Sequence, residues 1–199
     1  MTVYFHGSFG MSRRYMAGVL EGGLKKPKAS ADDLAAPFGY RAPFTARYRS
    51  WLHKTGIIEK GSRFTLTPMG EIIWKYDPEF KHVVTQWYMH HELCNDPTRN
   101  ETWHFFVNEF LPKNSMFTRD KLEAGLAKKL MPHGEKHFRA GSRMTKTISL
   151  KLLECYTTPE ALGSLGILSS DGKGNYRYKK PKPLGPWEAP QQLEREFAK

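Results

Sequence analysis

The densest group of residues able to do acid–base chemistry lies in the aromatic segment TQWYMHHELCNDPTRNETWHFFVNEF, residues 85–110. His90 falls on one expected helix, and Glu101 and Asn108 fall on the next. An antiparallel helix pair can bring such side chains together. The imidazole would then activate a water for attack on a phosphodiester, while the carboxylate or amide holds a divalent metal. The sequence therefore offers His90, Glu101 and Asn108 as a catalytic set, with Mg²⁺ or Mn²⁺ as the cofactor of such a nuclease.

A structural interpretation of the same segment stays open beside the catalytic one. Adjacent residues on a helix point about 100° apart, so at most one of His90 and His91 faces any given site. A histidine among tryptophans is often a hydrogen-bonded core residue rather than a proton carrier. On this interpretation the protein contacts its partner without cutting it.

The second chemistry that the sequence suggests is the binding of a polyanion. The chain has 199 residues and a net charge of +11, from 31 Lys and Arg against 20 Asp and Glu. Residues 112–151 hold ten Lys and Arg against three acids, whereas residues 79–111 hold two against five. A patterned excess of this kind favours nucleic acid as the partner. The alternatives are a solvated basic surface or a module that binds an acidic protein.

The amino-terminal part predicts helices that would position the first basic residues. Ser12 can cap a helix that runs to about residue 20 and is stopped by Gly22-Gly23, and Ser30 begins another that ends near Gly39. Apolar residues then recur at helical spacing over 41–54. Residues 56–58 and 63–66 read as two strands joined by a turn. Helix, helix and hairpin in this order are typical of a winged helix.

The remainder of the chain predicts a central helical pair and a second module of the same plan. The pair spans residues 82–94 and 100–110. Helices over about 118–130 and 145–156 follow, then strands near 166–168 and 176–179 around a turn at 171–175. The expected fold is mainly α with small β wings, in which two winged-helix-like modules flank a central aromatic helical core. The expected domains are residues 1–78, 79–112 and 113–199, the last with a tail helix.

A winged helix lays one helix in the major groove of DNA and places basic side chains of its wing against phosphates. Each module supplies candidates for both positions. The residues expected to contact DNA are Arg14, Arg41, Arg47, Arg49, Lys54 and Arg63 in the first module, and Arg143, Lys146, Lys151, Lys173, Arg177, Lys179 and Lys180 in the second.

Two further features bound the class of protein. Cys94 and Cys155 are too few for a disulfide framework or a CxxC metal site, so we expect reduced thiols in the core. No stretch approaches the ~18 uninterrupted apolar residues of a membrane span, and no basic start precedes an apolar run. We therefore expect a cytoplasmic protein without a membrane partner.

Several motifs resemble one bacterial family along the whole chain. They are the opening HGSF with Arg14-Tyr15, YRSWLHKTGII followed by LTPMGEIIWKYDP, the central TQWYMHHEL with ETWHFFVNEF, and LKLLECY, LGSLGIL and YRYKKP near the end. With these motifs the chain resembles the domain-of-unknown-function 4007 family. That family includes SspB-like proteins encoded beside cysteine desulfurase and ATPase genes of DNA phosphorothioation and related defence systems.

The resemblance implies a function on DNA within a modification or restriction system that acts in phage defence. For SspB-like members it implies a single-strand nicking endonuclease that opens the backbone for sulfur insertion. The alternative is a non-catalytic adaptor or regulator that recognises DNA and recruits ATPase and sulfur-transfer partners. The chain departs from the family pattern at Gly7, where many members have Glu after the first His, and at His91, where a bulky aromatic is frequent.

Overall fold

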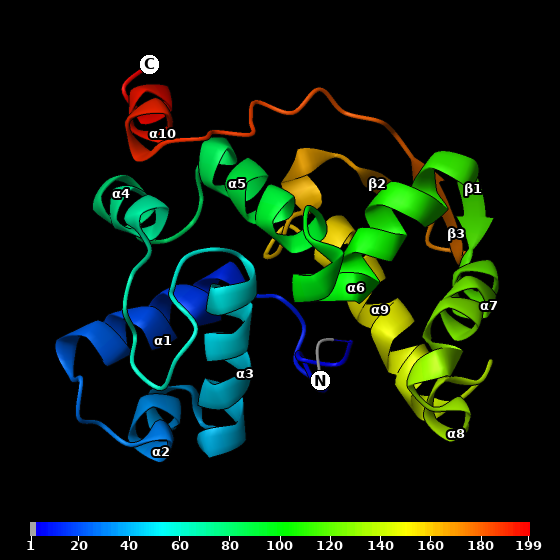
Figure 1. The fold of residues 1–199 in the computed structure, drawn as a ribbon, viewed down its shortest axis with the longest axis horizontal. Coiled ribbons are helices and arrows are strands. Elements are labelled where there is room, and N and C mark those ends of the chain that lie inside the picture. Colours follow the sequence, from blue (N-terminus) through cyan, green and yellow to red (C-terminus); the bar gives the residue numbers. More distant parts are fainter. Residues whose placement is uncertain (1–2) are drawn as a thin grey trace. The chain divides into compact units, whose positions relative to one another are not determined.

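The computed structural model describes residues 3–199, which are mainly helical with one small antiparallel sheet (Figure 1). The chain forms two compact units, each described below by itself. Unit 1 comprises Met1–Tyr4 and Cys94–Lys182, and unit 2 comprises Phe5–Leu93 and Pro183–Lys199. The boundary at residues 93–94 separates the two central helices that the sequence predicts as a pair.

Unit 2 contains the helices of the amino-terminal half and the last helix of the chain. Ser12 caps a helix as expected, because its side chain accepts the backbone N–H of Tyr15, and Thr67 caps another by accepting that of Gly70. Ser30 and Asp33 form a reciprocal capping box. In chain order the helices are α1 (Arg13–Lys25), α2 (Ala31–Ala35), α3 (Ala42–Lys54), α4 (Pro68–Tyr76), α5 (Val83–Cys94) and α10 (Pro190–Phe197).

The prediction that Gly22-Gly23 stops the first helix is wrong, because α1 continues to Lys25. Both glycines allow close packing instead of ending the helix. A Cβ on Gly23 would lie 2.2 Å from the ring of Phe64, and one on Gly22 would lie 3.0 Å from Leu34. Glycine inside a helix costs ~1 kcal/mol relative to alanine, and here it makes room for the side chains packed against α1.

The core of unit 2 is aromatic and is built around α3, which packs against α1 and α2. Phe44, Tyr48, Trp51 and Leu52 are buried at helical spacing along this helix. The indole N–H of Trp51 donates to the carbonyl of Phe9 at 3.2 Å. The periodicity of the sequence therefore predicted the buried face of α3.

The first expected hairpin is not a pair of strands. Residues 56–66 contain an isolated bridge between Ile58 and Leu66, and residues 59–63 form an exposed loop. The second arm is short because Thr67 is committed to the next helix: its hydroxyl donates to the carbonyl of Gly56 at 2.6 Å while it caps α4. The two predicted strands are thus reduced to one bridge.

Unit 1 has more short elements than the sequence predicts. Asn100 has non-helical backbone angles (φ −152°, ψ 76°) that kink α6. A π-helix, Phe105–Phe110, follows α6. Neither β1 nor α8 is predicted from the sequence. In chain order the main elements are α6 (Pro97–His104), β1 (Met116–Thr118), α7 (Arg119–Leu130), α8 (Glu135–Phe138), α9 (Arg143–Thr157), β2 (Leu168–Ser170) and β3 (Asn175–Tyr178).

The sheet of unit 1 has the order β1-β3-β2 and is antiparallel throughout. On β3, Arg177 lies between Met116 of β1 and Ser169 of β2, and Tyr176 stacks on Phe117 with ring centroids 5.6 Å apart. The expected hairpin over 166–179 is therefore confirmed as β2 and β3, and the central strand also pairs with β1.

Helices α7 and α9 pack together beside this sheet. The core between them holds Leu122, Leu126 and Ile148, each with no exposed surface, and Trp103 and Phe106 are equally buried in the same unit. No helix among the described residues combines the length and the apolar character needed to cross a membrane.

Candidate nucleic-acid interface

The clearest cationic feature of unit 1 is the exposed face of α9. Arg143, Lys146, Thr147 and Leu150 are spaced i, i+3, i+4 and i+7, and so they share one face of the helix. Arg143, Lys146 and Leu150 are exposed, whereas the opposite face buries Ile148 and other apolar residues. Ser142 caps the helix by accepting the N–H of Thr145. The amphipathic pattern that fixes α9 in the core therefore presents its cations to solvent.

Arg119, the first residue of α7, ties the two helices together at this face. Its Nη2 donates to the carbonyl of Lys146 at 3.0 Å, and its Nε donates to Glu123 Oε1 at 2.7 Å. Ser149 also donates to Glu123 at 3.0 Å, so the carboxylate has partners on both helices. This network of charge-assisted hydrogen bonds holds the guanidinium in a defined place.

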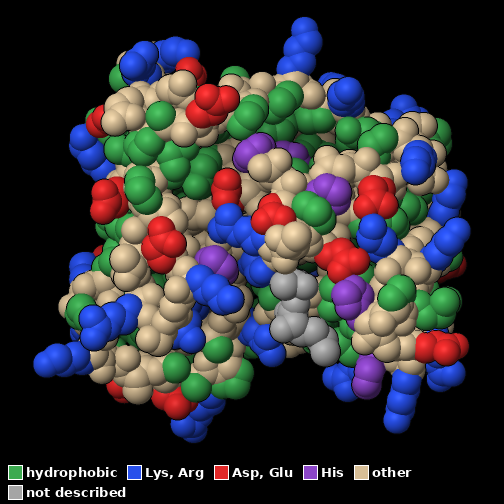
Figure 2. Space-filling model, viewed as in Figure 1, with side chains coloured by type: hydrophobic (Ala, Val, Ile, Leu, Met, Phe, Trp, Pro, Cys, Tyr) green, Lys and Arg blue, Asp and Glu red, His purple; other side chains and the backbone are tan. Residues whose placement is uncertain are grey.

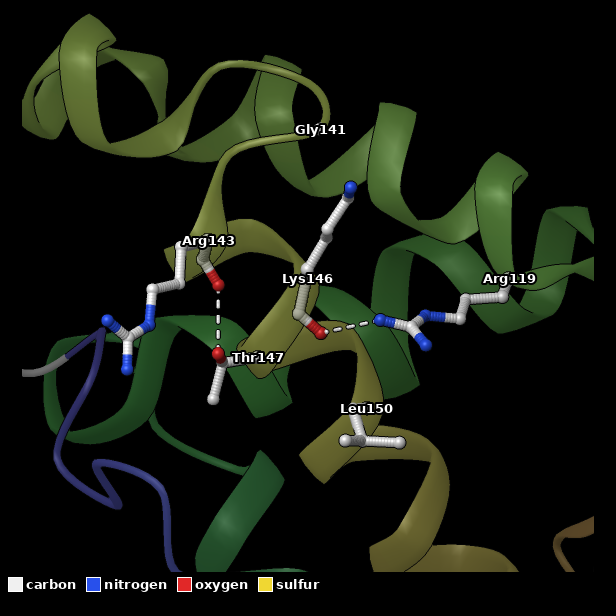
Figure 3. A pocket seen from close by; sticks show the side chains of 6 residues that line it. All are labelled: Arg119, Gly141, Arg143, Lys146, Thr147 and Leu150. Atoms are coloured by element: carbon white, nitrogen blue, oxygen red, sulfur yellow. Dashed lines mark hydrogen bonds between the residues drawn. The ribbon is translucent and has the colours of Figure 1, made fainter.

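The same residues line an open pocket of about 340 Å³. Figure 3 shows Arg143 and Lys146 extending from α9 in different directions, with Arg119 approaching from α7 and Leu150 one turn along. Thr147 donates to the carbonyl of Arg143 at 2.8 Å. Three cations around one opening can bind phosphate oxygens. The complete lining is Arg119, Gly141, Arg143, Lys146, Thr147 and Leu150.

The hairpin of β2 and β3 carries a second group of exposed cations. Asp171 organises its turn by accepting the N–H groups of Lys173 and Asn175 at 2.7 and 3.1 Å. The Asn175 side chain also donates to this carboxylate. This bond contributes most, followed by that from the N–H of Lys173, to holding the pKa of the Asp171 carboxyl below its ordinary value. Gly172 and Gly174 have positive φ, which glycine adopts without strain. The exposed cations of the hairpin and of the irregular segment that follows it are Lys173, Arg177, Lys179 and Lys180.

Lys151 differs from the other cations expected on the second module. Its side chain is only 14% exposed, and its ammonium bonds Glu154 at 2.7 Å on the same helix. A paired and largely covered lysine offers little charge to an external phosphate.

The arginines of unit 2 mostly hold backbone loops in place. Arg47 donates to the carbonyl of Phe5 at 2.9 Å, and Arg49 donates to that of Ser62 at 2.9 Å. Lys54 is buried, with its ammonium 5.8 Å from the centre of the Phe5 ring. Among the cations expected at DNA in this half, the exposed ones are Arg14, Arg41 and Arg63.

Figure 2 shows the lysine and arginine side chains on one face of the molecule. On this face they are spread over many positions, and carboxylates lie among them. The cations that share defined local geometry are those of α9 and of the β2–β3 hairpin.

The residues proposed for catalysis each have a separate environment. The ring of His90, on α5, lies edge-on to Trp87 with centroids 5.5 Å apart. Burial, followed by the nearby His91, lowers the pKa of His90 to about 4. In unit 1, Glu101 bonds the Nε2 of His133 at 2.7 Å, and the amide of Asn108 donates to the carbonyl of Cys94 at 2.7 Å.

A divalent metal held by protein side chains alone needs several His, Cys, Asp or Glu ligands in one place. Within residues 3–199, no three His, Cys, Asp or Glu side chains are grouped so that they could hold one. Glu101 and His133 form a close carboxylate–imidazole pair, but a pair without a third such ligand is not that kind of site.

Neither cysteine is in a disulfide, and both are buried, as the sequence predicts. Burial raises the pKa of the Cys155 thiol to about 12. Because the thiolate is the reactive form of cysteine, a thiol with this pKa is inert at neutral pH. The fold thus uses Cys155 as a small apolar side chain.

His6 lies in the opening motif HGSF and is fully buried. Its ring contacts Phe5 edge-on, and Nδ1 lies 2.7 Å from the carbonyl of Gly7. Gly7 has φ +60°, and a Cβ there would come within 2.9 Å of the Arg47 guanidinium. At Gly7 this chain therefore has a tight turn against an arginine.

The pocket also includes residues that the sequence did not single out. Arg119, Thr147 and Leu150 line the pocket but were absent from the expected contacts. An apolar residue on the polar face of the 145–156 helix was the available signal for Leu150. The pairing of Arg119 with Glu123 at i, i+4 was the corresponding signal on α7.

The fold and this surface define a mainly helical protein with a three-stranded antiparallel sheet and an exposed cationic helix face. A family model described as protein of unknown function (DUF4007) matches residues 45–181. The chain belongs to this family, and the resemblance inferred from its motifs is confirmed.

Two solved structures share the fold. One is described as a magnesium ion-bound SspB crystal structure, with a TM-score of 0.64, 14% identity and 92% of this chain covered. The other is described as an SspB crystal structure, with a TM-score of 0.61, 16% identity and the same coverage. The chain spans 61% of the length of each of those two chains. No curated protein matches the sequence.

Proposed function

We propose that this protein recognises duplex DNA as part of a DNA phosphorothioation system, and that α9 is its recognition helix. The observation that supports the proposal best is the exposed face of α9, where Arg143 and Lys146 project beside the anchored Arg119. A helix that presents basic side chains on one face can enter the major groove while cations beside it contact phosphates.

The order of elements in unit 1 supports the same proposal. Helices α7 and α9 are followed by the β2–β3 hairpin, which is the helix, helix and hairpin order of a winged helix. On this proposal Lys173 and Arg177 would contact phosphate from the wing. In unit 2 the equivalent hairpin is a single bridge, so we propose unit 1 as the DNA-reading module.

Between nicking and recognition, the arrangement of side chains favours recognition. Glu101 and Asn108 are hydrogen-bonded to His133 and to the carbonyl of Cys94. A neutral His90 with a pKa of about 4 would be a weak base for activating water at neutral pH. We therefore propose a DNA-recognition adaptor that recruits ATPase and sulfur-transfer proteins. The nicking alternative has one observation in its favour: one SspB neighbour is described as magnesium-bound, and divalent metals assist phosphodiester hydrolysis.

Binding to a labelled duplex over a range of salt concentrations tests the proposal. The double variant Arg143→Ala/Lys146→Ala removes two cations from the face of α9. We expect roughly 10- to 100-fold weaker binding, and a dependence of log K on log salt that is shallower by about two. Fluorescence anisotropy measures both quantities on the same samples.

Lys128→Ala is the matched control, because Lys128 is an exposed lysine on α7 outside the pocket. It should change the affinity about twofold or less. Equal losses from the control and from the double variant would show that α9 has no special role. In the same buffer, incubating supercoiled plasmid with Mg²⁺ or Mn²⁺ separates the two functions: open-circle product would replace the adaptor with a nicking enzyme.

A further inference from the structure

A cluster of aromatic rings in unit 2 ends in a partly exposed tyrosine. Tyr40 lies between α2 and α3, and 43% of its surface is exposed. Its ring stacks on the buried Phe44 with centroids 4.5 Å apart and planes 6° apart. It also contacts Phe9 and Tyr15 edge-on, at 5.7 and 6.3 Å. Tyr40 is thus an exposed ring that three neighbours hold in a fixed orientation.

Two arginines directly adjoin members of this ring cluster in the chain, and neither forms an ion pair within the described residues. Arg41 follows Tyr40 directly and is exposed at the start of α3. Arg14 is exposed on α1, with its guanidinium 6.0 Å from the ring of Tyr15. Their charges are therefore available to an anionic ligand, unlike those of Arg47 and Arg49, which donate to backbone carbonyls.

The nearby carboxylates are occupied by backbone N–H groups. Asp32 accepts the N–H of Ala42 at 2.9 Å, and Asp33 accepts that of Ser30 at 3.0 Å. Both therefore compensate the positive ends of helices. These hydrogen bonds hold the carboxylates at the helix starts in their charged form.

A fixed aromatic ring beside unpaired cations matches the chemistry of a single nucleotide strand. Every nucleobase has a π face that can stack on a tyrosine, and its phosphates can meet the neighbouring arginines. We propose that Tyr40, with Arg14 and Arg41, forms a stacking site for an unpaired base of single-stranded DNA. The site rests on different residues from the duplex-binding face of α9, so either can fail without the other.

Anisotropy of a short fluorescein-labelled oligothymidylate, titrated with the full chain, tests the site. Thymine does not form stable pairs with itself, so the probe is single-stranded. We expect Tyr40→Ala to weaken binding roughly 5- to 150-fold, the range for losing one stacked base. Tyr40→Phe keeps the ring and should bind like the original chain. Arg41→Ala should make the salt dependence shallower by about one.

Tyr76→Ala is the matched control, because Tyr76 is a tyrosine of similar exposure, 42%, in the same unit. It should leave oligothymidylate binding unchanged. Ultraviolet cross-linking gives a direct readout. A bromodeoxyuridine-substituted oligonucleotide should become attached to the peptide that contains Tyr40. A thermal melt of each variant identifies any loss of folding. If Tyr40→Ala does not fold, Tyr40→Phe and Arg41→Ala are used to test the site instead.

The possible results separate the two proposals. Loss of oligothymidylate binding in Tyr40→Ala, with duplex binding retained, supports the stacking site. Unchanged oligothymidylate binding in Tyr40→Ala, or absence of binding by the original chain, overturns it, including when duplex binding to α9 is normal. A failure of duplex binding alone overturns only the role of α9.

Discussion

The arginines of the two units do different things, although the sequence distributes them over similar helices. In unit 2, Arg13, Arg47 and Arg49 donate to the carbonyls of Phe80, Phe5 and Ser62, and so they fasten loops to helices. In unit 1, Arg143 and Lys146 form no hydrogen bond or ion pair through their charged ends within the described residues, and they line an open pocket. The cations that give the net charge of +11 therefore include some that are bound to backbone carbonyls and others that are exposed to solvent.

This comparison shows which observation separates a structural cation from one available to a ligand. A guanidinium bound to a buried carbonyl has already exchanged water for protein, and removing it leaves that carbonyl unsatisfied. A solvated cation has made no such exchange, so its loss affects binding more than stability. Substitutions that remove a charged or chargeable group from one class or the other should therefore change either stability or binding.

The largest expected effect is on the pH dependence of stability and comes from His90. Burial in unit 2 keeps its imidazole uncharged. Its folded-state pKa of about 4 lies below the ordinary 6.5, chiefly because of burial. Between these pH values the unfolded chain binds more protons, so stability is present above pH ~6.5 and is lost as the pH falls toward ~4. We expect a loss of at most about 3 kcal/mol, reduced to the extent that the ring reaches water.

Urea unfolding across this pH range measures the effect. His90→Gln cannot take up the proton and should flatten the dependence on pH. His91→Gln removes only the smaller, Coulombic cause of the shift and should retain most of it. If the original chain and His90→Gln lose stability equally between pH 6.5 and 4, His90 is not held neutral by the fold.

The next effect concerns Arg47, a fastening arginine of unit 2. Arg47→Ala removes a charged donor from the carbonyl of Phe5, and we expect the free energy of unfolding to fall by about 2 kcal/mol. Arg41→Ala, from the exposed start of the same helix, should change it by less than about 0.5 kcal/mol. Urea unfolding gives both values. Weaker duplex binding by a fully stable Arg47→Ala would remove the distinction between the two classes of cation.

Local sequence signals predicted most of the helices because they depend on nearby residues. Ser12 and Ser30 cap helices where expected, and the spacing of Phe44, Tyr48 and Trp51 identified the buried face of α3. Gly22-Gly23 misled because the choice between a helix end and close packing depends on Phe64, about forty residues away. Strand β1 was missed because it is three residues long and pairs with β3 some sixty residues later.

The candidate site shows the same limit. Charge and periodicity selected Arg143 and Lys146, and both lie in the pocket. Charge alone also selected Lys54, Arg47 and Lys151, whose partners are visible only in the folded chain. The catalytic set of His90, Glu101 and Asn108 remains a prediction. The expected pairing of two helices does not determine what each side chain contacts.

The smallest effect concerns Arg119, which belongs to both classes of cation. It lines the pocket of unit 1, yet it also donates to the carbonyl of Lys146 and to Glu123, as the arginines of unit 2 donate to their loops. Lysine keeps the charge but cannot reproduce the planar fork that meets both acceptors. For Arg119→Lys we therefore expect a loss of about 1 kcal/mol in the free energy of unfolding, with the salt dependence of duplex binding unchanged. Urea unfolding and anisotropy on one preparation measure the two quantities. Unchanged stability in Arg119→Lys would place Arg119 among the solvated cations, and the anchoring network would then not be what holds α7 to α9.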